Sequence, residues 1–157
     1  MTKEESKKDI AWLILCFLLL TSCNMPGRTG QRMYSGFFGN PLDSCVQILN
    51  SRDTRALDDC CMWLHFKVCP QESKRILSQV PYSLKPMGKK EIAMEFPELP
   101  SSIDEDIIST DPPKWWILRQ LGDSCLKYEY FRPNEDYAQV VYISMDSSEI
   151  FYRVTTW

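Results

Sequence analysis

The sequence has few of the residues and motifs that catalytic, cofactor-binding or nucleic-acid-binding proteins require. It contains a single histidine, His65, and none of its seven cysteines stands in a Cys-x-x-Cys pair. Without a Cys-x-x-Cys pair, a thioredoxin-like redox site has no support. The sequence also has no G-x-S-x-G motif, so a common serine-hydrolase site has no support either. Like charges never run beyond three residues and the formal net charge is −3, which offers no basic groove for nucleic acid. We therefore expect no catalytic site, no cofactor and no nucleic-acid partner.

A long hydrophobic run is also missing. The longest unbroken apolar stretch, residues 11–20, has ten residues, whereas a helix needs about 20 to cross the hydrocarbon core. Its length suits the apolar region of a cleavable export signal, which is about 7–15 residues long. Lys3, Lys7 and Lys8 supply the positive flank that precedes such a region.

The apolar stretch ends in Leu20-Thr21-Ser22-Cys23, which resembles the lipobox of bacterial lipoprotein precursors. That pattern is an apolar residue, two small residues and an invariant cysteine. The resemblance implies that residues 1–22 are a signal peptide, and that Cys23 becomes the acylated first residue of a membrane-anchored chain. Asn24 stands where Asp would favour retention in the inner membrane, so the outer membrane, on its periplasmic side, is expected. An uncleaved interfacial helix and a buried N-terminal helix are the alternatives.

The part of the chain after the lipobox is expected to form one domain. Residues 23–40 hold the lipidated Cys23 and a stretch with four glycines and a proline, which is typical of a flexible tether. Three aromatic residues within it, Tyr34, Phe37 and Phe38, are expected to dock on the domain rather than on lipid. Residues 41–157 are long enough for a single small α+β domain with its own core.

Helical periodicity predicts three helices between residues 41 and 80. The first covers about 41–50, with Asn40 as its N-cap, and the second about 53–68. The second is apolar on nearly all sides, which favours a central position. Pro70 begins a third helix that ends near Val80. None of these segments resembles a family of known activity.

Strand patterns dominate the C-terminal part. Alternation of apolar residues predicts strands over about 91–96, 126–132, 138–145 and 149–156, joined by turns. A short helix is expected between Pro113 and Leu121, with Gly122 beyond its end. The predicted fold is therefore α+β, with the N-terminal helices packed on a C-terminal antiparallel sheet.

Five cysteines follow the anchor and are candidates for disulfides: Cys45, Cys60, Cys61, Cys69 and Cys125. Export would place them in an oxidising compartment, where disulfides persist. In a helical hairpin Cys45 would lie level with residues 58–61, which predicts a bond to Cys60 or Cys61. Cys69 and Cys125 would form a second bond.

A zinc site is the alternative interpretation of the same residues. Cys61, His65 and Cys69 recur every four residues, and with Cys45 they would complete a Cys₃His set. Ligands on successive helical turns lie about 6 Å apart, so three of them cannot reach one ion without unwinding. Disulfides or packing are therefore expected, with no metal.

Trp115 and Trp116 follow two prolines and are the best candidates for a binding surface. Two adjacent indoles cannot both face one core, so one is expected to pack inward. The other would remain as a platform for a partner or a sugar ring. The interpretation that carries more weight is that the proline-rich stretch 81–113 buries both.

These features predict a non-enzymatic lipoprotein of the bacterial envelope. It would bind another envelope component, either a protein or peptidoglycan or another polysaccharide. A secreted-enzyme inhibitor or immunity-type lipoprotein is one alternative. A hydrolase with His65 as its base is another, because a nucleophile of the Ser or Cys type needs such a base.

Overall fold

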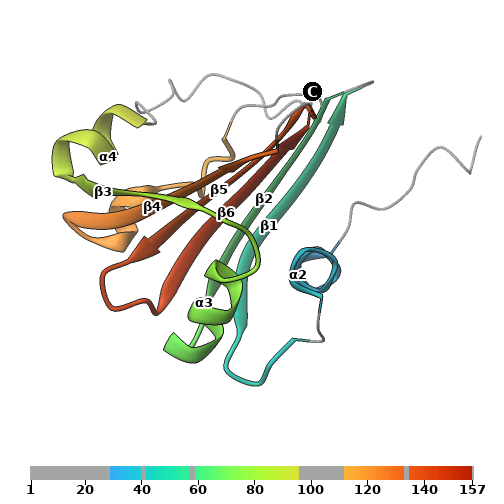
Figure 1. Ribbon diagram of the computed structural model, residues 1–157, viewed down its shortest axis with the longest axis horizontal. Coiled ribbons are helices and arrows are strands. Elements are labelled where there is room, and N and C mark those ends of the chain that lie inside the picture. The colour runs from blue at the N-terminus through green and yellow to red at the C-terminus, as the bar shows by residue number, and fades with distance from the viewer. Residues whose placement is uncertain (1–28, 40–41, 57–58, 96–111, 133–134, 157) are drawn as a thin grey trace, which may run out of the picture.

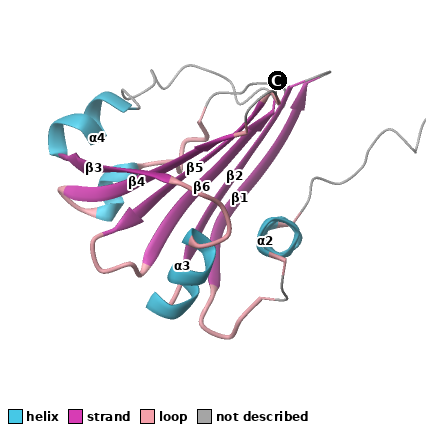
Figure 2. Ribbon diagram, viewed as in Figure 1, coloured by secondary structure: helices cyan, strands magenta, loops and turns pink. Residues whose placement is uncertain are grey.

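A computed structural model describes residues 29–39, 42–56, 59–95, 112–132 and 135–156. The expected signal peptide and the expected lipidation site, Cys23, lie outside these ranges. Figures 1 and 2 show a single sheet of strands with helices packed beside it. In chain order they are α2 (Gly30–Phe38), β1 (Gln47–Ala56), β2 (Asp59–Lys67), α3 (Pro70–Leu77), β3 (Ser83–Gly88), α4 (Lys89–Glu95), the 3-10 helix η1 (Leu118–Leu121), β4 (Ser124–Phe131), β5 (Tyr137–Ser144) and β6 (Glu149–Thr156).

The sheet has six strands in the order β1-β2-β6-β5-β4-β3. Every neighbouring pair is antiparallel. Helix α2 lies beside β1 at one edge, and α4 lies beside β3 at the other (Figure 1). The α+β class and the antiparallel sheet predicted from the sequence are confirmed, as are the three C-terminal strands and the helix that begins at Pro70.

The two helices predicted over 41–50 and 53–68 are wrong, because residues 47–56 and 59–67 form β1 and β2. Strand β2 lies between β1 and β6, and a buried core covers each of its two faces. Leu64 and Phe66 are buried on one face, and Trp63 on the other. A strand buried on both sides has no alternation of polar residues, and its apolar run looks the same as that of a buried helix.

Three smaller predictions also need correction. The strand predicted over 91–96 is wrong, because α4 occupies Lys89–Glu95; residue 96 lies outside the described ranges. The helix expected between Pro113 and Leu121 is reduced to η1, although Gly122 follows its end with φ 101°. Residues 30–38 of the expected tether form α2. As expected, the aromatic residues of this segment dock on the domain, since Tyr34 and Phe38 are buried.

The residues that flank helix α2 explain where it begins and ends. Thr29 is its N-cap, and its side chain accepts from the Arg32 N–H at 3.4 Å. Gly39 ends the helix with φ 74°, a conformation that glycine adopts without steric cost. A Cβ at Gly30 would come within 2.6 Å of Ile48 Cγ2. Only glycine therefore lets α2 lie this close to β1.

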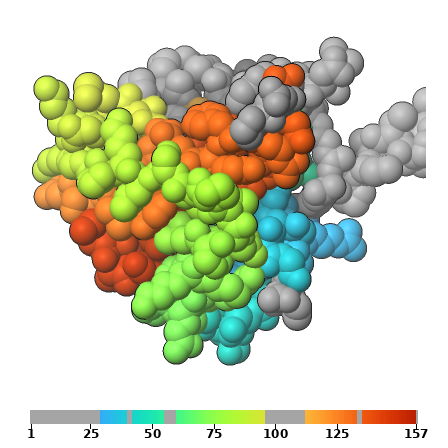
Figure 3. Space-filling model, viewed as in Figure 1, coloured from blue at the N-terminus to red at the C-terminus, as the bar shows by residue number. Residues whose placement is uncertain are grey.

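One face of the sheet, which we call the helix face, is covered by α2 and α3. Figure 3 shows the surfaces of these two segments next to each other, in blue and green. The helices contribute Tyr34, Phe38 and Ile76 to a core of buried apolar side chains. The strands contribute Met62, Leu64, Phe66, Val141, Ile143, Ile150, Tyr152 and Val154.

The opposite face, which we call the tryptophan face, is covered by residues 115–121 and by α4. Trp116, Leu118, Leu121 and Ile92 pack down on it. Beneath them lie Cys61, Trp63, Cys125, Val140, Tyr142 and Phe151 of the strands. The two cores are separated by the sheet, so each covering layer is held by its own set of contacts.

Candidate functional site

A tight turn sets the two adjacent tryptophans in different directions. The Trp116 N–H donates to the Pro113 carbonyl at 2.8 Å, and the Ile117 N–H donates to the Trp115 carbonyl at 2.9 Å. Trp116 is only 4% exposed and lies edge-on to Trp63, with ring centroids 4.7 Å apart. Trp115 remains partly exposed. The prediction that one indole packs inward is confirmed, and burial of both is wrong.

His65 lies under Trp115 between two polar partners. Its Nε2 is 2.7 Å from Glu149 Oε1, and its Nδ1 is 3.3 Å from Asn50 Nδ2. A carboxylate can only accept, so Nε2 carries the proton and Nδ1 accepts from the amide. Burial lowers the pKa of His65, although Glu149 opposes this effect. The ring is therefore neutral near pH 7.

This geometry leaves His65 little scope as a catalytic base. Both ring nitrogens are engaged, and the side chain is 4% exposed. A general base must reach the proton that it removes within hydrogen-bonding distance. The arrangement instead holds the imidazole parallel to its aromatic neighbours: 3.8 Å and 15° from Phe151, and 6.3 Å and 13° from Trp115.

We define the Trp115 surface as Trp115, the ring of His65 that stacks on it, and Asn50 and Glu149, which contact the two ring nitrogens of His65. Asn50 comes from β1, His65 from β2 and Glu149 from β6, and Asn50 pairs with His65 in the register of the sheet. The sequence pointed to Trp115 and His65 separately, but it gave no sign of Asn50 or Glu149. Their proximity depends on strand register, which cannot be derived where the strands themselves are taken for helices.

A second polar group lies under α4 on the same face. Lys127 Nζ is 2.5 Å from Glu95 Oε1 and 2.8 Å from Glu129 Oε1. The Tyr142 hydroxyl donates to Glu95 Oε1 at 2.6 Å. Burial raises the pKa of Glu95, but the hydrogen bonds from Lys127 and Tyr142 outweigh it and the net shift is downward. These bonds tie the last residue of α4 to the sheet.

The helix face carries a disulfide, Cys45–Cys69, that joins the loop before β1 to the N-cap of α3. Cys45 and Cys69 were both candidates, but the predicted partners were wrong. Cys60 and Cys61 lie in β2, not in a helix beside Cys45. Cys61 and Cys125 are buried thiols whose pKa is raised by burial to about 11. They are therefore protonated and poor nucleophiles near pH 7.

The zinc alternative fails on the same evidence. Cys45 and Cys69 are bonded to each other, so neither offers a thiolate. Cys61 and His65 are four residues apart on a strand, which corresponds to about 13 Å. In the described ranges, no three His, Cys, Asp or Glu side chains come together as metal ligands.

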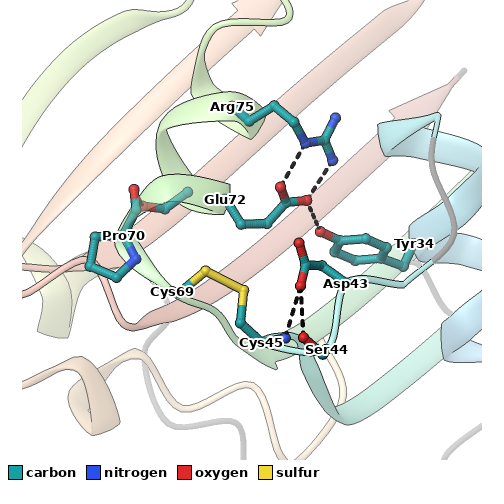
Figure 4. Close-up of a disulfide and its surroundings, with 9 residues drawn as sticks. Tyr34, Asp43, Ser44, Cys45, Cys69, Pro70, Glu72 and Arg75 are labelled. Atoms are coloured by element: carbon teal, nitrogen blue, oxygen red, sulfur yellow. Dashed lines mark hydrogen bonds and ion pairs between the residues drawn. A yellow bond between two sulfur atoms is a disulfide. The ribbon is translucent and has the colours of Figure 1, made fainter.

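Figure 4 shows how the disulfide adjoins a charged network between the two helices. Tyr34 of α2 donates its hydroxyl proton to Glu72 of α3. Arg75 donates to the same carboxylate, with Nε 2.7 Å from Oε2 and Nη2 2.5 Å from Oε1. The hydrogen bonds from Arg75 are the main reason that the pKa of Glu72 is lowered. The i,i+3 spacing of Glu72 and Arg75 was a signal for this pair in the sequence.

Arg75 also fixes the end of α2. Its Nη1 donates to the Phe38 carbonyl at 2.9 Å, and Gln79 Nε2 donates to the same oxygen at 3.0 Å. A carbonyl at a helix C-terminus has no partner within its own helix. Helix α3 supplies that partner, so the two helices are coupled through Phe38 as well as through Tyr34.

Comparison of the chain with protein-family models, with curated proteins and with solved structures finds no match in any of the three. Within the described segments, no helix combines the length and the apolar character needed to cross a membrane. The function must therefore be argued from the lipobox-like sequence Leu20-Thr21-Ser22-Cys23, the disulfide and the Trp115 surface.

Proposed function

We propose that the protein is a lipid-anchored domain of the bacterial cell envelope that binds another envelope component through the Trp115 surface. The observation that carries this proposal is the sequence Leu20-Thr21-Ser22-Cys23 at the end of a ten-residue apolar run. Acylated Cys23 would hold the chain at the membrane. Two or more acyl chains give stable anchoring, because one chain alone binds reversibly.

The disulfide supports an exported protein. Disulfides persist in oxidising compartments such as the periplasm and are rare in the cytosol. The bond between Cys45 and Cys69 closes a loop of 24 residues in sequence and lies beside the helix nearest to the proposed anchor. A disulfide at this position suits a domain that forms its covalent bond after export.

The distance between anchor and domain supports a position close to the membrane. Thr29, the N-cap of α2, is six residues after Cys23. Six residues span at most about 20–22 Å when fully extended. Asn24 favours the outer membrane, where the domain would face the periplasm and meet peptidoglycan and other envelope proteins.

A binding role fits the polar groups better than a catalytic one. His65 is enclosed by Asn50 and Glu149, and the buried thiols are protonated near pH 7. The partly exposed Trp115 is instead suited to contact with a partner, because large rigid aromatics supply much of the affinity in many interfaces.

Metabolic labelling with a fatty acid tests the anchor. The wild-type protein should incorporate the label, and Cys23→Ala should abolish it. Cys16→Ala is the matched control, because it changes the other cysteine before Thr29 and should leave labelling intact. Separation of inner and outer membranes should find the labelled protein in the outer one. A labelled Cys23→Ala protein, or a mature chain that does not begin at Cys23, would refute the proposal.

A further inference from the structure

We propose that the Trp115 surface binds a saccharide, with the indole ring stacked on a pyranose and with Asn50 and Glu149 bonded to its hydroxyls. This inference rests on the proposed function, since it names the chemical class of the envelope component. A pyranose has a face of C–H groups and a rim of hydroxyls. It therefore requires one flat apolar surface with polar groups beside it.

The aromatic part of the surface is held in a fixed orientation. Trp115 lies 13° from the plane of His65, and His65 lies 15° from the plane of Phe151. Trp115 also contacts Trp116, whose ring is fixed edge-on to Phe151 at 5.1 Å. A ligand that stacks on Trp115 therefore orders little of the protein, and preorganisation of this kind favours affinity.

The polar part of the surface is fixed by the histidine. Asn50 and Glu149 are held on the two ring nitrogens of His65, at 3.3 Å and 2.7 Å. Both side chains remain partly exposed, Glu149 to 20%. An amide has four hydrogen-bonding positions and a carboxylate about four acceptor positions. Each group thus retains capacity for vicinal hydroxyls, which donate and accept.

The surroundings favour a saccharide over a protein partner. Among the described residues, the only exposed large hydrophobic side chain in the segment that carries Trp115 is that of Ile117. The others lie on β3, in α4, at the end of β4 and just after β5: Leu84, Met94, Phe131 and Met145. A protein hot spot is typically surrounded by further contact residues that exclude water. A small polar ligand needs only a few fixed polar groups beside an aromatic ring.

Calorimetric titration of the full-length lipidated protein in detergent tests this proposal. The probes are chitotetraose and the soluble fragments that a muramidase releases from peptidoglycan. At least one probe should bind the wild type with a Kd of about 1 mM or below. Trp115→Ala should weaken binding at least about tenfold, whereas Trp115→Phe should retain part of it because a stacking ring remains. Phe131→Ala is the control, because Phe131 is 60% exposed outside the surface, and it should bind like the wild type.

Two results would overturn the saccharide proposal. One is the absence of binding for both probes up to about 10 mM. The other is binding that Trp115→Ala leaves unchanged, since the ligand would then lie elsewhere. Loss of fatty-acid label on Cys23→Ala is independent of both results. If a photo-crosslinker at residue 115 captures an envelope protein while neither probe binds, the envelope-binding proposal stands and the saccharide proposal falls.

Discussion

Each face of the sheet carries a buried apolar core, but the two cores are closed by different means. The helix face is closed by a disulfide and by the network that joins Tyr34, Glu72 and Arg75. The tryptophan face is closed by Trp116 and by ion pairs under α4, without a covalent bond among its described residues. The covalent bond thus lies on the face that carries α2, the described helix closest to the proposed anchor. The surface proposed to bind lies on the other face.

In the proposed function, the helix face would therefore serve anchoring and the tryptophan face would serve binding. Tension on the proposed tether would act on α2, which Arg75 of α3 holds through the Phe38 carbonyl. The Cys45–Cys69 bond in turn ties α3 to the loop before β1. The tryptophan face carries no such load, and its outer ring, Trp115, remains partly exposed. Each face can therefore be weakened separately, and three sets of measurements test whether the faces are as different as their contacts indicate.

The largest effect is expected on the tryptophan face. Trp116→Ala should lower the free energy of unfolding by about 3–5 kcal/mol, because it removes a buried ring that packs on Trp63, Tyr142 and Phe151. Trp115→Ala should lower it by less than about 1 kcal/mol, because that ring is partly exposed. Urea unfolding of both variants measures the difference. Equal losses would mean that both indoles are core and that the Trp115 surface does not exist as such.

The helix face should depend on its covalent bond. Replacing both Cys45 and Cys69 with serine should lower the free energy of unfolding by about 3–4 kcal/mol, since the bond closes a loop of 24 residues in sequence. A thiol reductant should destabilise the wild type by a similar amount. The double variant provides the control, because the reductant should not change its stability. A reductant effect of the same size on both proteins would place the important disulfide elsewhere.

The smallest effect concerns pH. Burial lowers the pKa of His65 from its ordinary value of 6.5, so the unfolded chain takes up a proton before the folded one does. Stability is then complete above about pH 6.5 and falls on acidification, by at most about 1.4 kcal/mol per pH unit. Unfolding measured between about pH 7 and 5 should show this slope.

His65→Gln provides the comparison, because it removes the titrating ring and should flatten the slope. Glu72 and Glu95, whose pKa values are lowered from 4.5, add their own losses only near and below that pH. They should do so in both proteins. An unchanged slope in His65→Gln would show that another group titrates in this range.

The sequence predicted the C-terminal half of the sheet because its strands obey local rules. Strands β5 and β6 are rich in β-branched and aromatic residues and are bounded by polar turns. Strand β1 is an edge strand with polar residues such as Asn50, Arg52 and Asp53, so it lacks the apolar alternation of a half-buried strand. The prediction for β2 failed for the opposite reason. Both of its faces are covered, so its residues form an apolar run without alternation.

The candidate site was predicted only in part, for a related reason. Trp115 and Trp116 are adjacent, so local backbone geometry is enough to suggest that one ring packs inward and the other does not. The meeting of Asn50, His65 and Glu149 depends on the pairing of three strands. The partners of Cys45 depend in the same way on whether residues 53–67 are a helix or a strand. Such long-range placements are not encoded in any short window of the sequence.

The order of the strands has a consequence for how the chain folds. Strand β2 pairs with the last strand, β6, from Cys60 opposite Thr156 to Lys67 opposite Glu149. Contacts between residues this far apart in sequence slow folding, because a long loop must close before they form. The centre of the sheet cannot assemble until residues 149–156 have emerged. During the proposed export the apolar β2 would therefore remain without its central partner until β6 arrives, and this eight-residue strand sets the moment at which the sheet becomes complete.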